Sequence, residues 1–137
     1  MPCNLVILGK TLDIDAFLSK SKLRGCFKHY KGEPKFKSKP LGEKLPYSSL
    51  VTQTSKASFD NLEKQIADTI KYLKRHKSKL SLIKTTKEVE NALLDFGVAL
   101  RINKKQPAQF DRYPNSLLSL ASELGLDLHI SLYSIDK

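Results

Sequence analysis

Apolar and polar positions follow regular periods along most of the chain, and these periods predict alternating strands and helices. Residues 3–8 form a continuous aliphatic run, which is typical of a buried strand. Asp13 then begins a short helix that runs to about residue 20. Two further strands are predicted at residues 24–30, as an edge strand, and at residues 47–54, with Leu50 and Val51 buried.

The strongest helical period follows Ser58, a residue type that favours helix N-termini. Apolar side chains recur three, four or seven positions apart from Phe59 to Ile83, and no proline or glycine interrupts them. One helix reaching about residue 84 fits this pattern, and so do two helices with a break near Lys77.

The C-terminal part alternates between both periods. Residues 91–102 place apolar side chains at every second position, which predicts a strand with one buried face. A helix follows, with Pro114 in its first turn and Gly125 at its end. The final strand, residues 126–133, is expected to point four apolar side chains inward: Leu126, Leu128, Ile130 and Leu132.

The element order β-α-β-β-α-β-α-β predicts an α+β fold with a single mixed sheet and helices mainly on one face. The first six elements match a ferredoxin-like βαββαβ core, and the final αβ unit would extend its sheet. We expect one domain over residues 1–137. It would carry a long basic loop at about residues 32–46, rich in proline and glycine and anchored by Phe36, Leu41 and Leu45.

The chain has 137 residues, of which 40% are apolar, so it is long and apolar enough to bury one core. It shows no apolar run of membrane-spanning length and no signal-peptide pattern, which predicts a cytoplasmic protein. Cys3 and Cys26 are expected to be free thiols. Cys26 lies among basic residues, so it is either an activated thiol or an ordinary strand residue. The scattered histidines lack zinc-ligand spacing, and we expect no metal and no cofactor.

The net charge of +10 is concentrated in two segments. Residues 20–44 hold nine basic and two acidic residues, and residues 71–87 hold seven basic residues and no acidic ones, so each segment carries +7. If the two segments meet in space, they would draw anionic partners to one face. The residues expected to form this patch are Lys28, Lys31, Lys35, Lys37, Lys39, Lys74, Arg75 and Lys77.

Two further groups are candidate binding residues. Phe110, Asp111, Arg112 and Tyr113 directly precede Pro114, so Arg112 can bind an anion beside a helix N-terminus. Alternatively, Asp111 caps that helix while the two aromatic rings pack together. The second group contains Asp95, Arg101 and His129, together with Tyr133, on the polar faces of two strands. If these strands are neighbours, the group is either an acid–base or anion-binding cluster or an ordinary solvated face.

The C-terminal half resembles a group of uncharacterised bacterial proteins in residues 94–98 (LDFGV), 109–114 (QFDRYP), 117–121 (LLSLA) and 124–133 (LGLDLHISLY). It is also loosely similar to domain-of-unknown-function proteins found near polymorphic-toxin immunity genes. The resemblance covers residues 59–135. It implies a small cytoplasmic bacterial α+β protein, without known catalysis, of the immunity type.

These observations favour a non-enzymatic interaction module that binds an acidic protein partner. The alternative is a nucleic-acid-binding protein that uses the lysine-rich segments 20–44 and 71–87, with aromatic rings among the lysines for base stacking. A third hypothesis is a small enzyme that uses Asp95, Arg112 or His129. The oligomeric state stays open.

Overall fold

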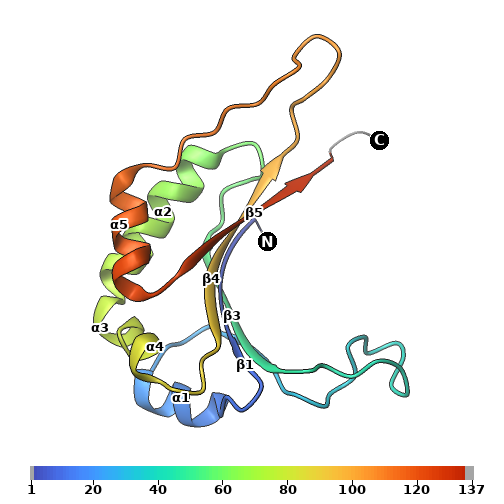
Figure 1. Ribbon diagram of the computed structural model, residues 1–137, viewed down its shortest axis with the longest axis vertical. Helices are drawn as coiled ribbons and strands as arrows, with labels where there is room; N and C mark the ends of the chain where they lie inside the picture. Colours follow the sequence, from blue (N-terminus) through green and yellow to red (C-terminus); the bar gives the residue numbers. More distant parts are fainter. Residues whose placement is uncertain (1, 135–137) are drawn as a thin grey trace.

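The computed structural model describes residues 2–134 and contains one five-stranded sheet with helices on one side of it (Figure 1). This confirms the predicted α+β class. The strands lie in the order β2-β3-β1-β4-β5, and they comprise β1 (Cys3–Gly9), β2 (Phe27–His29), β3 (Ser48–Ser55), β4 (Asn91–Ala99) and β5 (Asp127–Tyr133).

The sheet is mixed. The central strand β1 is antiparallel to both β3 and β4, and β2 is antiparallel to β3. Strand β5 is parallel to β4 and lies at the outer edge of the sheet. The four strands β2-β3-β1-β4 therefore agree with the ferredoxin-like expectation in element order and antiparallel pairing, and the last αβ unit adds the fifth strand.

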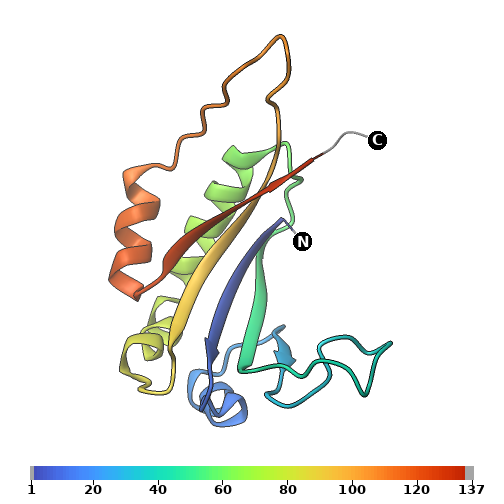
Figure 2. The ribbon, with the colours of Figure 1, turned by 45° about the vertical axis from the view of Figure 1, so that its right-hand side comes forward.

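The helices form a second layer that packs on one face of the sheet (Figures 1 and 2). Between the layers, Leu5, Leu94 and Phe96 of the sheet are fully buried, as are Leu73 and Leu117 of the helices. Because one layer covers one face, the central strand β1 buries every second side chain. The helices are α1 (Ile14–Ser21), α2 (Leu62–Arg75), α3 (Lys77–Leu80), α4 (Leu82–Thr85) and α5 (Asn115–Leu124).

Helix α2 begins later than its sequence predicts. The side chain of Asn61, not that of Ser58, accepts the capping hydrogen bond, from the Lys64 amide at 3.2 Å. The Ser58 hydroxyl instead donates to the Asp60 carboxylate within the preceding turn. Phe59 therefore lies outside the helix. The helix ends at Arg75, which confirms the break near Lys77 over one continuous helix.

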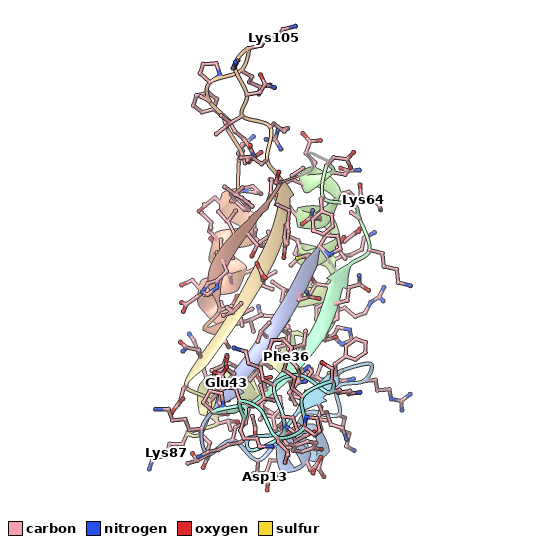
Figure 3. All side chains as sticks on the ribbon, turned by 90° about the vertical axis from the view of Figure 1, so that its right-hand side faces the viewer. Asp13, Phe36, Glu43, Lys64, Lys87 and Lys105 are labelled. Carbon is pink, nitrogen blue, oxygen red and sulfur yellow. The ribbon has the colours of Figure 1, made fainter. Side chains whose placement is uncertain are left out.

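The other face of the sheet carries no helix, and its strands bend so that this face is concave (Figure 1). Along β1, Cys3, Leu5 and Ile7 are buried, whereas Asn4, Val6 and Leu8 are partly exposed. Val51 of β3 is partly exposed in the same way, so the expectation that it is buried is wrong. We call this side the uncovered face, and Figure 3 shows it toward the viewer.

Residues 31–46 form a lobe that projects on the side of the uncovered face, below its lower end (Figures 1 and 3). Backbone hydrogen bonds between Lys35 and Glu43 (2.8 Å) and between Gly32 and Leu45 (3.0 Å) hold its two arms together. Leu41 is 97% exposed and Phe36 is 56% exposed, so these two do not anchor the lobe as expected. Leu45 is half-buried.

Strand β5 departs from its predicted pattern. Leu128 packs against the core, but Ile130 and Leu132 are 52% and 57% exposed, so the expectation that these two are buried is wrong. The physical reason is the course of the strand, because β5 diverges from α5 toward its C-terminal end and leaves the helix layer behind (Figure 1). Among residues 2–134, no helix is long and apolar enough to cross a membrane.

Candidate binding site

The motif at residues 110–113 is built around a paired carboxylate. Asp111 forms an ion pair with Arg101, which lies just after β4, and it accepts a hydrogen bond from the Gln109 side-chain amide at 2.9 Å. The side-chain carbonyl oxygen of Gln109 also accepts a hydrogen bond from the Arg101 backbone N–H at 2.8 Å. These interactions therefore hold the loop that contains Asp111 close to the end of β4. Asp111 does not cap α5, whose N-cap residue is Pro114 and has no side-chain capping bond.

Burial raises the pKa of Asp111, but the hydrogen bonds from Gln109 and Arg101 and the Arg101 charge outweigh this effect. The pKa of Asp111 therefore lies below its ordinary value, and the carboxylate stays ionised.

Phe110 and Arg112 border a hollow of about 440 Å³ beside the N-terminus of α2. Phe110 is 90% exposed. Two cations (Arg101 and Arg112) and three carboxylates (Asp60, Glu63 and Asp111) line the hollow, so its formal charge is −1. This charge disfavours the anion-binding role that Arg112 was predicted to have.

Tyr113 points inward from the same motif. Its ring packs edge-on against Phe96 with 5.5 Å between centroids. Its hydroxyl is buried and has no hydrogen-bond partner among residues 2–134. Burial raises the pKa of Tyr113 to about 12. Tyr113 is thus a core residue, and it does not pack with Phe110 over a helix end.

The structure brings together only part of the second predicted group, which contains Asp95, Arg101, His129 and Tyr133. Asp95 and His129 are register partners on β4 and β5, and Asp95 accepts a hydrogen bond from Ser131 at 2.7 Å. Arg101 instead pairs with Asp111. Tyr133 packs against Phe59 with the rings tilted by 56° and 4.9 Å between their centroids. Asp95 and His129 therefore contribute to one polar row of the uncovered face without the cation that was expected beside them.

A basic hollow of about 560 Å³ lies between the lobe and the β2–β3 edge of the uncovered face. Lys28, Lys35 and Lys37 line it together with His29, and its aromatic and apolar lining is Phe27, Tyr47, Pro34 and Leu45. Glu33 is the one carboxylate in this lining. With three lysines against one glutamate, the hollow has a formal charge of +2 when histidine is neutral.

The two basic segments touch without forming one patch. The Lys79 ammonium donates to the Lys22 carbonyl at 3.3 Å, which joins the segments at one point. The lobe that carries Lys31, Lys35, Lys37 and Lys39 projects on the uncovered side, whereas the helices that carry Lys74, Arg75 and Lys77 lie on the opposite side (Figure 1). Three lysines of the expected patch also form ion pairs: Lys28 with Asp15, Lys35 with Glu43 and Lys77 with Glu123.

The two thiols are free, and burial raises the pKa of each. Burial raises the pKa of Cys26, against a smaller opposing effect of a hydrogen bond with Thr52. Cys3 is buried, and its Sγ lies 3.0 Å from the Thr54 hydroxyl and 3.2 Å from the Thr69 hydroxyl. Among residues 2–134, no three histidine, cysteine or acidic side chains form a group able to hold a metal ion.

The feature that sequence reasoning missed is an apolar row across the uncovered face. Phe27 pairs with Val51, Val51 with Val6, and Val6 with Leu93, so these side chains lie side by side on four strands. The adjoining row is polar and contains Gln53, Asn4, Asp95 and His129. The signal in the sequence was Val6 and Leu8, two apolar residues on the second face of β1.

The chain belongs to the family described as domain of unknown function DUF4279, whose model matches residues 1–135. No curated protein matches the chain, and no solved structure matches it.

Proposed function

We propose that this DUF4279 protein is a binding module whose uncovered sheet face and basic hollow together hold an acidic amphipathic helix of a partner protein. The observation that carries the proposal is the continuity of the two surfaces. Phe27 belongs both to the apolar row and to the lining of the basic hollow, and His29 and Ser49 line the hollow from the same face.

The spacing of the apolar row suits a helix laid across the strands. Neighbouring strands are about 4.8 Å apart, so four strands present apolar side chains over about 14 Å. One turn of an α-helix advances about 5.4 Å, which is close to the strand spacing. Apolar residues at i, i+3 or i+4 and i+7 of a partner helix would therefore meet successive strands.

The lobe gives the site its charge preference. Residues 31–46 contain five lysines and two glutamates, a net charge of +3. Lys35 is paired with Glu43, whereas Lys37 lines the hollow, forms no ion pair among residues 2–134 and lies on the side of the uncovered face. Carboxylates that flank the apolar stripe of a helix would complement this field. A finer proposal is that the partner is a bacterial toxin, which rests on the resemblance of residues 59–135 to immunity-type proteins.

The test uses a soluble amphipathic helical peptide of leucine and glutamate, labelled for fluorescence anisotropy, and a second peptide with lysine in place of glutamate. We expect the acidic peptide to bind and the basic one not to bind. Lys37→Glu, in the hollow, should weaken binding by about fivefold, a typical effect of one surface charge. The matched control is Lys74→Glu, which makes the same charge change on the exposed surface of α2 and should leave binding nearly unchanged.

The apolar row is tested by Val51→Thr, with Leu118→Thr on the exposed side of α5 as its control. Weaker peptide binding in Val51→Thr alone supports the proposal, and equal effects in both variants contradict it. A labelled oligothymidine that binds more tightly than the acidic peptide, with affinity falling steeply as salt rises, would replace this proposal with nucleic-acid binding.

A further inference from the structure

We infer that β5 is a docking edge for a second copy of this chain, so that two sheets join through an antiparallel β5–β5 pair. Within residues 2–134, β5 pairs with β4 along one side, and no strand pairs with its other side. A strand edge of this kind presents backbone N–H and C=O groups that another strand can pair with. This inference concerns a different edge from the proposed partner site and does not depend on it.

The two edges of the sheet differ in how they resist such pairing. Strand β2 is three residues long, contains Lys28 and leads into the lobe. Strand β5 is seven residues long and contains no proline, lysine or arginine. Short length and lysine are common protections of an edge strand, so β2 is protected and β5 is not.

The direction of the backbone groups selects one register. The Tyr133 carbonyl accepts a hydrogen bond from the Leu100 amide of the β4 side at 2.9 Å. Backbone groups alternate in direction along a strand, so Leu128, Ile130 and Leu132 present their N–H and C=O groups to the open edge. A twofold axis at Ile130 pairs Ile130 with its own copy and Leu128 with Leu132 of the second copy. In this register, the outward backbone N–H and C=O groups of Leu128, Ile130 and Leu132 all meet hydrogen-bond partners on the second copy.

The same register also places apolar side chains of the two copies next to each other. Ile130 and Leu132 lie on the helix side of the sheet beyond the reach of α5, and more than half of each is exposed. In the pair, each of these side chains would lie beside an apolar residue of the second copy. The register is thus self-complementary in backbone polarity and in side-chain character, as a twofold interface requires.

Charge also favours this edge over the rest of the surface. The chain carries +10, so most approaches of two copies bring lysines together. From residue 113 to residue 134, however, the acidic and lysine or arginine side chains are only Glu123 and Asp127. Strand β5 therefore brings no lysine or arginine of its own to the contact between two basic copies. The lobe lies at the opposite edge of the sheet and stays free (Figure 2).

The first test is the mass of the full chain by light scattering after gel filtration at micromolar to submillimolar concentration. We expect a dimer of twice the 15.5 kDa chain mass. Ile130→Lys should give a monomer with unchanged circular dichroism. The control Leu41→Lys, which replaces an exposed leucine on the lobe, should leave the dimer intact. A wild-type monomer over this range, or a folded dimeric Ile130→Lys variant, overturns the inference.

The second test fixes the register by crosslinking in a Cys26→Ser background. In a hydrogen-bonded antiparallel pair, opposing Cα atoms are about 5.5 Å apart, which a disulfide can bridge. Ile130→Cys should therefore give a covalent dimer on mild oxidation. Leu132→Cys is the matched control, because the two copies of residue 132 would lie about 14 Å apart along the strands. Equal crosslinking of both variants, or crosslinking of Leu132→Cys alone, contradicts the proposed pairing.

Discussion

Replacing Tyr113 with phenylalanine removes a hydroxyl group that is buried without a hydrogen-bond partner among residues 2–134. A buried polar group left unpaired costs about 1–3 kcal/mol of folding free energy. The ring itself packs edge-on against Phe96, and phenylalanine preserves that contact. We therefore expect Tyr113→Phe to raise the free energy of unfolding by about 1–2 kcal/mol.

The alkaline pH dependence provides a second measure of the same hydroxyl. The folded-state pKa of Tyr113 is about 12, whereas the ordinary value is 10.0. The folded protein therefore holds this proton more tightly than the unfolded chain does. The resulting stability is fully present below pH 10 and is lost as the pH rises toward 12. At about 1.4 kcal/mol per pKa unit, and with solvent screening part of the effect because the side chain is only partly buried, the wild type should lose about 1–2 kcal/mol that the variant does not lose.

Urea unfolding followed by circular dichroism, at pH 7 and at steps from pH 9 to pH 11.5, measures both effects. The variant should show a higher urea midpoint with an unchanged slope, because the surface exposed on unfolding is the same. Tyr30→Phe is the control: it removes an exposed 2.9 Å hydrogen bond to Asp15 and should lower stability by at most about 1 kcal/mol.

Destabilisation of Tyr113→Phe by 1 kcal/mol or more would refute this reasoning, because it would require the hydroxyl to be paired in the folded protein. An identical alkaline slope in the wild type and the variant would show that Tyr113 does not titrate with a raised pKa.

Three further changes have expected outcomes. Gly97→Ala should lower the free energy of unfolding by about 1–3 kcal/mol in urea titrations, because a Cβ atom there would lie 2.8 Å from Phe59 Cε1. Asp111→Asn should lose about 1 kcal/mol at pH 7 by weakening the pair with Arg101. Since the pKa of Asp111 is lowered in the folded state, this difference should vanish as the pH falls through that pKa, and an equal difference at pH 2 would argue against the pair. Cys26 should react with a thiol reagent more slowly than a small free thiol at pH 8, because burial raises its pKa; faster reaction would indicate an activated thiol.

Local sequence signals predicted most of the elements. Asp13 caps α1 as expected, with its side chain accepting from the Ala16 amide at 3.0 Å. Gly125 ends α5 in the left-handed conformation that glycine adopts readily. Alternation predicted the buried face of β4, where Leu94, Phe96 and Val98 are fully enclosed. These features depend on neighbours within a few residues, so the sequence alone contains the necessary information.

The first residue of α2 could not be predicted from the neighbouring sequence alone. Ser58 and Asn61 are both capping residue types, and the prediction chose the first. Phe59 instead lies over Gly97, which has room for its ring because glycine lacks a Cβ atom, and Tyr133 completes the contact. Gln65, fully buried, fixes this segment by donating to the carbonyls of Ser58 and Gly97 at 2.9 and 2.8 Å. These contacts join residues far apart in sequence, so no local pattern shows them.

For the candidate site, the sequence could predict individual residues and segments but not how they are arranged in space. The sequence identified the lysine-rich loop, Phe27 within a basic segment, and Arg101 and Asp111 as members of two separate candidate groups. It could not show that Asp111 neutralises Arg101, or that the basic lobe and the basic helices lie on opposite sides of the sheet.

By itself, the sequence determined the α+β class, the strand and helix order, and the concentration of charge in two segments, because periodicity and composition act locally. Only the tertiary structure decided which face of the sheet the helices cover, and therefore that Val6, Val51 and Leu93 form a partly exposed apolar row. It also decided that Ile130 and Leu132 are exposed. A strand's alternation separates its two faces, but the packing of distant elements determines whether each face meets a helix or water.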